Sequence, residues 1–229
     1  MTELIAGCVC LTGSVYFFWR AINYLRLVRV IEDTPSTNIT STPQGMVEVK
    51  GKTLPLENQQ LMVPRKNVPC VWYRYEITEE LSDDEYSETE TKESHERFYI
   101  EDHTGICAID PMHADIHAKK EYEEYKDRCT HKVSWIGVDE SVYVLGWMQT
   151  LHPEQKTDNV ITVREGKEHR YGQLNDKLDR ITKPPHSWLP FIISTHFEHQ
   201  LVKKYRSLFI SWVIGGIILL GFAVKLLKG

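Results

Sequence analysis

Two apolar segments, one close to each end of this 229-residue chain, constrain its fold more than any other feature. Residues 4–19 and 208–224 carry no charged side chain, whereas the stretch between them is largely polar. Extended by its flanks, each segment reaches about 20 residues, which is long enough to cross the ~30 Å hydrocarbon core of a bilayer as a helix. The sequence therefore predicts a two-pass integral membrane protein, in which a folded domain lies between two membrane helices.

The chain divides into four predicted parts. These are an N-terminal transmembrane helix and its extension (1–31), a polar linker (32–42), a β-rich domain (43–196) and a juxtamembrane segment with the C-terminal transmembrane helix (197–229). The stretch between the helices, roughly 180 residues, has the length of one domain. A net charge of −5 without a basic face argues against nucleic acid as a partner. Five cysteines without paired spacing do not indicate a disulfide framework.

Alternating apolar and polar residues predict β-strands through most of the domain. The expected strands are residues 46–49, 68–78, 96–100, 106–109, 132–138, 142–150 and 190–195. They are short and irregularly spaced, which favours a mainly β fold of α+β type, a small antiparallel barrel or sandwich, over an α/β fold.

Three further segments complete the expectation for the domain. Residues 79–90 contain seven acidic side chains and no basic one, and we expect the solvated tip of a hairpin there. A calcium loop is the alternative, but the segment lacks the central glycine of an EF-hand. Helix-forming residues predict one peripheral helix over 114–127. Residues 154–185 are interpreted as a strand or two with loops.

Small side chains recur every four residues on both apolar segments. Ala6, Cys10 and Ser14 share a face of the first helix, and Ser211 and Gly215 share a face of the second. Such faces allow close helix contact, either within the hairpin or between chains of a homo-oligomer. The alternative is that small residues are simply common in membrane helices. A third hypothesis for function, membrane perturbation by assembled helices, rests on these faces alone.

Charge at the helix flanks predicts the orientation. Six basic residues lie on the domain side of the two apolar segments and only two beyond the second: Arg20, Arg26, Arg29, Lys203, Lys204 and Arg206 against Lys225 and Lys228. By the positive-inside rule, this asymmetry predicts a domain on the cytoplasmic side.

Cys70 lies in an alternating strand beside Trp72 and Tyr73. The period of two places Cys70 and Trp72 on one face and Tyr73 and Tyr75 on the other. Because buried cysteine and aromatic side chains are common in β cores, we expect packing roles for them. The alternative is a nucleophilic Cys70, which requires a base such as His103 or His131.

Two other sets of residues are candidates for chemistry. His113 and His117 would share one face of a helix and could begin a metal site, but spacing identifies no third ligand and no cofactor is expected. Asp102, Gly105, Asp110 and Pro111 indicate a tight turn in which Gly105 adopts a positive φ and Asp102 caps backbone amides. The alternative is that Asp102 and Asp110 form a catalytic carboxylate pair.

Several separated patches resemble the GIDE family, whose eukaryotic member is a mitochondrial ubiquitin ligase with a beside-a-membrane domain between two membrane helices. The patches are residues 31–35, 44–51, 69–75, 98–105, 110–111, 142–146 and 190–194. They include Cys70, Trp72, Tyr73, Asp102, Gly105, Asp110 and Pro111, which the resemblance implies are structural signature residues. In the mitochondrial relative the domain lies in the intermembrane space, opposite to the side that the flanking charge predicts here.

The family's ligase activity belongs to a RING, which needs eight Cys or His ligands in paired spacing. No Cys-x-x-Cys pair occurs in these 229 residues. The resemblance therefore implies the anchored β domain of the RING-less prokaryotic members and not ubiquitin transfer. We expect a non-enzymatic protein that binds a protein, peptide or lipid at the bilayer. The alternatives are a cysteine- or metal-dependent membrane hydrolase, and a ubiquitin-ligase-related protein acting through a RING partner in trans.

Overall fold

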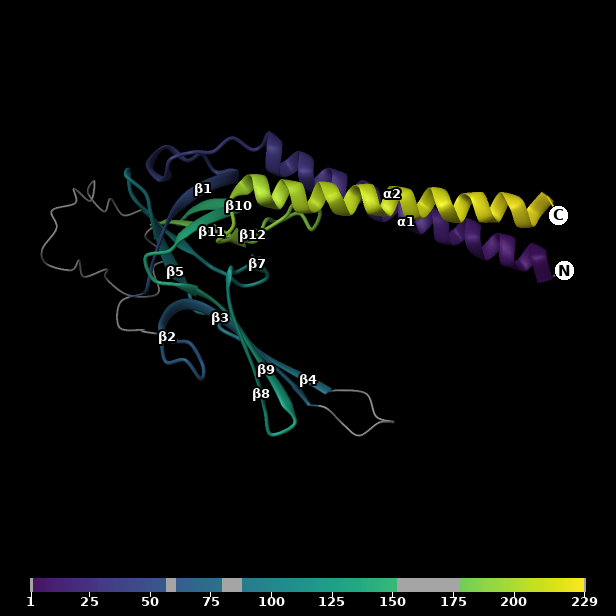
Figure 1. Cartoon of the computed structure of the whole chain (residues 1–229). Helices are drawn as coiled ribbons and strands as arrows, with labels where there is room; N and C mark the ends of the chain where they lie inside the picture. Colours follow the sequence, from purple (N-terminus) through teal and green to yellow (C-terminus); the bar gives the residue numbers. More distant parts are fainter. Residues whose placement is uncertain (1, 57–60, 80–87, 152–177, 229) are drawn as a thin grey trace, which may run out of the picture. The chain divides into compact units, whose positions relative to one another are not determined.

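The structure is a computed structural model that describes residues 2–56, 61–79, 88–151 and 178–228. It separates into two compact units. One combines Met1–Thr34 with Phe197–Gly229, and the other is Pro35–His196. Figure 1 shows the first as a pair of helices and the second as β structure.

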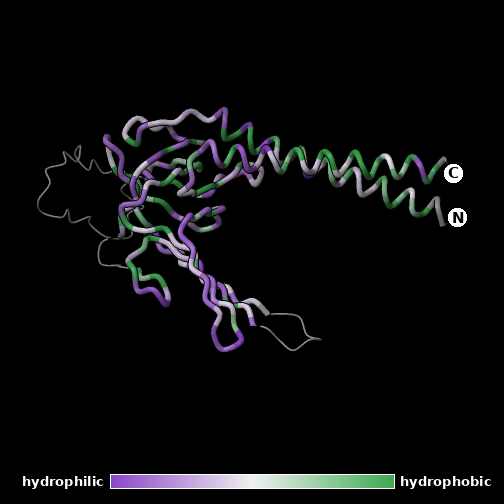
Figure 2. Tube along the Cα trace, viewed as in Figure 1, coloured by the Kyte–Doolittle hydropathy of each residue, from purple (hydrophilic) through white to green (hydrophobic). Residues whose placement is uncertain are grey.

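The helical unit is an antiparallel hairpin. Helix α1 (Thr2–Asp33) and helix α2 (Glu198–Lys228) lie side by side, with both chain termini at the same end (Figure 1). Hydrophobic residues dominate both helices over most of their length (Figure 2). Ile5–Asp33 and Glu198–Leu227 are long and apolar enough to cross a membrane. This confirms the two apolar helices and is compatible with a two-pass membrane protein.

The second unit is mainly β and is built around a closed five-stranded barrel. The barrel strands are β1 (Gly45–Leu54), β5 (Phe98–Glu101), β6 (Ile106–Ile109), β10 (Ser141–Leu151) and β11 (Leu178–Thr182). Around the barrel the order is β1-β5-β6-β11-β10, and β10 closes onto β1. Among these five strands, only β6 and β11 pair in parallel. Numbered along the chain, this order is 1-2-3-5-4, a Greek-key closure of the OB-fold kind. The predicted mainly β class is confirmed.

Two short strands extend the barrel at β10. Strand β12 (Ile192–Ser194) pairs antiparallel with β10, and β7 (Asp115–His117) pairs in parallel with β12. Strand β10 also pairs with β1 along its other edge. It therefore connects the barrel to these two short strands.

A second sheet is assembled from two insertions into the barrel. The insertion between β1 and β5 supplies β2 (Leu61–Met62), β3 (Pro69–Glu79) and β4 (Glu88–Glu93). The insertion between β6 and β10 supplies β8 (Lys120–Lys126) and β9 (Cys129–Gly137). The central pair is β3 and β9, flanked by β2 and β4 on one side and β8 on the other. Together these strands form an arm that extends from the barrel (Figure 1).

The main core fills the barrel and continues into the base of the arm. Val47 and Val49 of β1 and Ile100 of β5 point inward with Ile109, Val144 and Ile181 from the other barrel strands. Val71, Trp72 and Ile136, where the arm begins, belong to the same cluster. These side chains are buried, which explains why the strands are rich in β-branched residues. Closure also removes exposed sheet edges from the barrel.

The face assignment predicted for Cys70 is wrong. The register of β3 against β9 shifts between Cys70 and Trp72, as in a β-bulge. Trp72 and Val71 therefore both enter the barrel core, whereas Cys70 packs with Val63 in a separate cluster on the arm. The extra residue of a bulge reverses the alternation on one side of it, which spacing alone does not reveal.

The peripheral helix predicted over 114–127 is also wrong. Strands β7 and β8 occupy this segment. Strand β8 has good helix formers, but Tyr122 packs against the arm cluster and its backbone pairs with β9 along the whole strand. Pairing within the sheet outweighs a propensity of a few tenths of a kcal/mol per residue.

The remaining expectations concern segments between strands. Residues 32–42, predicted as a linker, are structured in part: α1 continues to Asp33, and Ile39 of the 3-10 helix Ile39–Ser41 is buried in the barrel core. The predicted acidic hairpin is present as the antiparallel pair β3 and β4, and its tip at 80–87 lies outside the described residues. In the segment 154–185, where a strand or two was expected, the structure contains β11. Residues 152–177 lie outside the described residues.

Candidate functional site

The Asp102 carboxylate organises the turn between β5 and β6. Its Oδ1 accepts hydrogen bonds from the Thr104 backbone N–H at 2.7 Å, the Thr104 hydroxyl at 2.6 Å and the Gly105 N–H at 2.9 Å. Its Oδ2 accepts the Ile39 N–H at 2.8 Å. Asp102 thus caps backbone amides and fastens the 3-10 helix to the barrel.

The protonation of Asp102 follows from these contacts. Burial by itself would raise the pKa of the carboxyl group, but hydrogen bonds from the Thr104 hydroxyl and from three backbone N–H groups outweigh burial and lower the pKa. A depressed folded-state pKa stabilises the fold above the pKa of the unfolded chain. That contribution is lost as the pH falls through the folded-state pKa.

Gly105 does not have the positive φ that the turn pattern predicts, since the only described glycine with one is Gly45. Its role is instead close approach. A Cβ at Gly105 would lie 3.1 Å from the Thr40 hydroxyl oxygen, beside the hydrogen bond from Thr40 Oγ1 to the Thr104 carbonyl.

Asp102 and Asp110 do not form a carboxylate pair. They lie at opposite ends of the β5–β6 hairpin, five residue steps apart along the strands, or roughly 16 Å at 3.3 Å per residue. Paired glycosidase carboxylates lie within ~10 Å of each other. Asp110 instead faces Arg97 at 3.6 Å and Arg180 at 4.0 Å, and Pro111 follows it as a buried residue.

Cys70 has the environment of a packing residue. It is 1% exposed, and burial raises the pKa of its thiol to about 11, with a smaller contribution from Glu96. His131 pairs with Ile77, six residues along β9 from Gly137, the partner of Cys70, which separates them by roughly 20 Å. His131 is therefore too far from Cys70 to deprotonate its thiol. His103 is exposed in the barrel turn.

We expect Cys70 to be unreactive in the folded protein. Cys70→Ala should lower the free energy of unfolding by about 1–2 kcal/mol, as for loss of a small buried side chain. Because the pKa of the Cys70 thiol is raised in the folded state, folding favours the neutral thiol. The contribution of the neutral thiol to stability is complete below the pKa of the unfolded thiol, and it declines as the pH rises toward about 11. Maleimide labelling with and without denaturant measures accessibility, and rapid alkylation at neutral pH without denaturant would contradict burial.

The two histidines do not share a helix. His113 is exposed in a turn with a φ of 67°, and His117 ends β7 with its Nε2 3.2 Å from Asp115 Oδ2. Within the described residues, no group of three His, Cys, Asp or Glu side chains could hold a metal ion. The two histidines are therefore not brought together with a third ligand there.

The helical hairpin has a closely packed seam around Gly215. A Cβ on Gly215 would lie 2.5 Å from Phe17 Cε1, and the Phe17 ring lies 4.7 Å from that of Trp212. Ser14 is buried, and its hydroxyl donates a hydrogen bond to the Leu11 carbonyl oxygen. Cys10 is half-buried. Ala6 and Ser211 are exposed, so the five small residues do not form one continuous contact.

Aromatic side chains surround an arginine where the apolar segments end. The Arg20 guanidinium lies 5.4 Å from the ring centroids of Trp212 and Tyr24. Tyr24 stacks on Tyr205 at 6.4 Å. Cation–π contacts and aromatic rings of this kind are typical of helix ends at a membrane interface.

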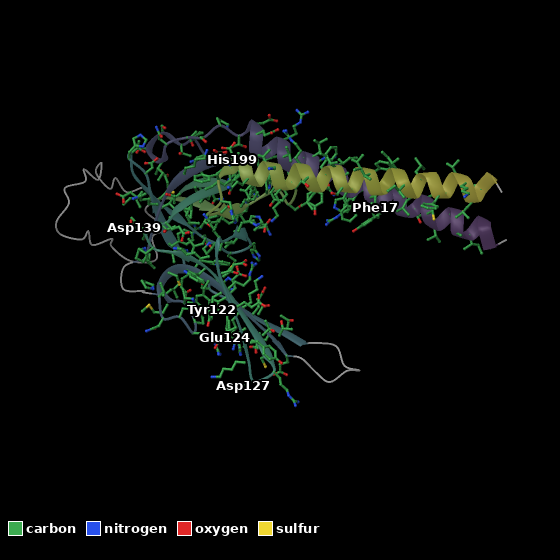
Figure 3. All side chains as sticks on the ribbon, in the orientation of Figure 1. Phe17, Tyr122, Glu124, Asp127, Asp139 and His199 are labelled. Atoms are coloured by element: carbon green, nitrogen blue, oxygen red, sulfur yellow. The ribbon has the colours of Figure 1, made fainter. Side chains whose placement is uncertain are left out.

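One surface of the arm was not singled out in the sequence. The loop after β2 folds over the sheet, so that Arg65 contacts Glu124 at 3.2 Å and the Lys66 Nζ lies 3.9 Å from the Tyr122 ring centroid. Hydrogen bonds to Tyr75 and Glu124 raise the pKa of Arg65. Figure 3 shows Tyr122 and Glu124 on the arm. The turn-forming run Pro-Arg-Lys-Asn at 64–67 was the available signal.

Beside this loop, Tyr75 hydrogen-bonds to His131 Nδ1 at 2.8 Å. Tyr75, Tyr122 and His131 are half-buried, so part of each ring is accessible. We call Arg65, Lys66, Tyr75, Tyr122 and His131 the arm surface. It includes two tyrosine rings and an arginine, residue types that are enriched at protein interfaces.

Comparisons with known proteins identify no relative. No family model, no curated protein and no solved structure matches this chain. Its function must therefore be argued from its own residues.

Proposed function

We propose that this protein is a non-enzymatic, two-pass membrane protein whose β domain binds a protein or peptide at the bilayer surface. The observation that carries the anchoring is the exposure of large apolar side chains along both helices. Val9, Val15, Ile214, Ile217 and Phe222 are all more than half exposed. Contiguous apolar surface of this length is unfavourable in water but matches hydrocarbon.

The two helices also differ from core helices of a soluble protein. Only 17% of the most apolar window of α1 and 11% of that of α2 is buried. A core helix of comparable hydropathy would bury most of its surface against other elements. The hairpin contacts bury one stripe on each helix and leave the remaining surface for lipid.

Binding is favoured over catalysis by the state of the candidate groups. Burial raises the thiol pKa of both Cys70 and Cys107, which opposes formation of a nucleophilic thiolate at neutral pH. The arm surface, in contrast, presents partly accessible aromatic and cationic side chains. Tyrosine and arginine, both present on it, are among the residue types that dominate binding energy in interfaces.

The GIDE resemblance adds to this proposal. A RING-less member would retain the anchored β domain and bind partners without transferring ubiquitin itself. Any ubiquitin chemistry would then come from a RING protein bound in trans. On the charge at the helix flanks, we place the domain on the cytoplasmic side.

Topology can be measured in the full chain. Reporter cysteines at Thr2 and Gly229 should react with an impermeant maleimide from the same side of the membrane, in a background with Cys8 and Cys129 replaced by serine. Asp139→Cys, in an exposed turn of the β domain, should react only from the opposite side. Labelling of the two termini from different sides would exclude the hairpin, and release of the chain by alkaline carbonate would exclude membrane integration.

A further inference from the structure

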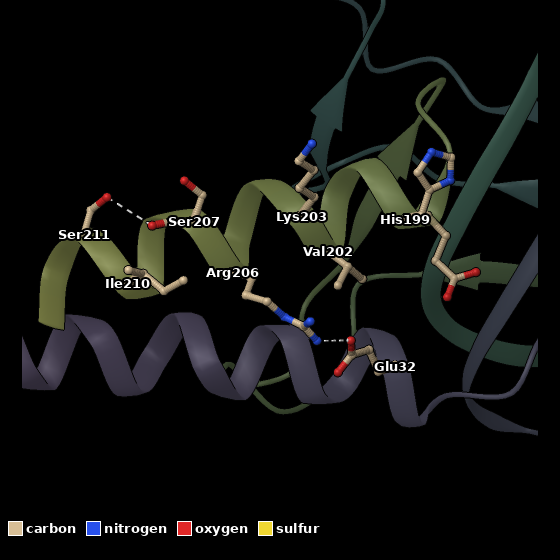
Figure 4. A pocket seen from close by; sticks show the side chains of 9 residues that line it. Glu32, His199, Val202, Lys203, Arg206, Ser207, Ile210 and Ser211 are labelled. Atoms are coloured by element: carbon tan, nitrogen blue, oxygen red, sulfur yellow. Dashed lines mark hydrogen bonds and ion pairs between the residues drawn. The ribbon is translucent and has the colours of Figure 1, made fainter.

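A cavity of about 550 Å³ lies between the C-terminal turns of α1 and the first turns of α2. Glu32 of α1 forms one side of it, and Val202, Lys203, Arg206, Ser207 and Ile210 are on α2 (Figure 4). All of these residues belong to the helical unit. The cavity is therefore part of the hairpin itself.

Polarity changes along the cavity in the direction of the helix axis. Its charged lining residues are Glu32, Glu198, Lys203 and Arg206, and all four lie outside the apolar segment that begins at residue 208. Ile210 and Ser211, also in the lining, already belong to that segment, and the Ser211 hydroxyl donates to the Ser207 carbonyl within the helix. In a membrane-inserted hairpin, the charged part would lie at the depth of lipid headgroups and the apolar part at the start of the acyl chains.

Two cations, Lys203 and Arg206, line this cavity. Arg206 contacts Glu32 across the helices at 2.6 Å, and this ion pair holds its guanidinium at the cavity (Figure 4). A guanidinium has five N–H donors, and one contact with Glu32 leaves several for a second acceptor. Lys203 makes no ion pair with any of the described residues, although the carboxylate of Glu198 also lines the cavity. Ser207 also lines the cavity, and its hydroxyl is a further potential donor.

The surrounding flanks increase the preference for negative charge. Residues 20–33 and 198–207 contain six Lys or Arg against three Asp or Glu, a net charge of +3 with histidine neutral. Clusters of basic residues beside membrane helices attract anionic lipids.

We propose that this interhelical cavity binds the phosphodiester headgroup of an anionic phospholipid from the surrounding bilayer. The proposal rests on the membrane insertion proposed above and adds the identity of a ligand. Lys203 and Arg206 contact the phosphate oxygens, Ser207 donates a hydrogen bond, and Ile210 lies against the glycerol and the first methylene groups. The polarity gradient favours a lipid over a free anion, because a soluble ion makes no use of the apolar end.

The test uses the full chain reconstituted in phosphatidylcholine vesicles that contain a minor fraction of spin-labelled phosphatidylglycerol. The fraction of motionally restricted label reports lipid bound to the protein. Lys203→Gln should weaken this binding about fivefold, since one basic residue near an anionic surface contributes about 1 kcal/mol. Lys204→Gln is the matched control: it removes the same charge from the neighbouring position, but Lys204 is outside the cavity lining and lies near the Tyr205 ring. It should weaken binding less than twofold.

A second variant tests the cavity without changing charge. Ser207→Trp fills the cavity with a side chain that is common at membrane–water interfaces. It should also reduce the fraction of motionally restricted lipid label. Equal effects of Lys203→Gln and Lys204→Gln, with no effect of Ser207→Trp, would show general surface attraction and overturn the proposal. Displacement of the label by inorganic phosphate would assign the cavity to a soluble anion.

Membrane integration is scored in the same samples by resistance to alkaline carbonate. If the chain is integrated but shows no preference for the anionic label over a spin-labelled phosphatidylcholine, this inference fails and the anchoring stands. If the chain is extracted, the anchoring fails, and the lipid site fails with it.

Discussion

Gly215→Leu is expected to separate the two helices of the hairpin without preventing their insertion. A Cβ at this position would lie 2.5 Å from Phe17 Cε1 and 2.7 Å from Cδ1. The Phe17 ring cannot easily move aside, because it already packs against Trp212 and Tyr16. Overpacking of this kind costs about 1–3 kcal/mol. In lipid, helix association depends on close van der Waals contact, so this loss directly opposes pairing.

Helix pairing can be measured in membranes by energy transfer or crosslinking between reporters on α1 and α2. Gly221→Leu is a suitable control, since no atom lies within 4 Å of a Cβ placed there. Both substitutions change length and hydropathy of the span equally, so insertion should be the same. Equal pairing in the two variants would mean that the contact between Gly215 and Phe17 does not hold the helices together.

Trp72→Ala is expected to cause the largest loss of stability in the β unit. Trp72 is 1% exposed and lies where the barrel core continues into the arm. Truncation of a buried tryptophan costs about 3–5 kcal/mol through lost burial and the cavity left behind. Trp72→Phe should cost clearly less, because Trp72 Nε1 is buried without a hydrogen-bond partner in the described structure and no hydrogen bond is lost.

Denaturant unfolding of the full chain in detergent, followed by near-ultraviolet circular dichroism, measures both variants. Trp188 is the matched control, since it lies in the same unit and is 70% exposed. Trp188→Ala should change the free energy of unfolding by about 0.5 kcal/mol or less. A comparable loss for Trp72→Ala and Trp188→Ala would contradict the assignment of Trp72 to the core.

Much of the β unit was predictable because local patterns have local causes. Alternation in β1 and β10 follows from strands that have one face in a core, as Val47, Val49 and Val144 show. The capping role of Asp102 was likewise readable, since an Asp before Thr-Gly bonds the amides that follow it. Such features depend on residues that are close in sequence.

Several properties of the candidate sites were not predictable for the opposite reason. The bulge beside Cys70 depends on the register between β3 and β9. These two strands are far apart in the sequence, so local spacing does not reveal their register. The helix predicted from good helix formers over 114–127 would have included His117, yet β7 pairs with β12 and β8 pairs with β9 instead. The cavity beside Arg206 depends on how Glu32 faces it from the other helix.

The sequence by itself determined the two apolar helices, the mainly β class and most strand positions, since hydropathy and alternation act within a few residues. Only the tertiary structure decided how the strands close. Barrel closure requires β1 to pair with β10, and the arm requires two separate insertions to form one sheet. These pairings join distant segments, and their free energy comes from a shared core that no single segment contains.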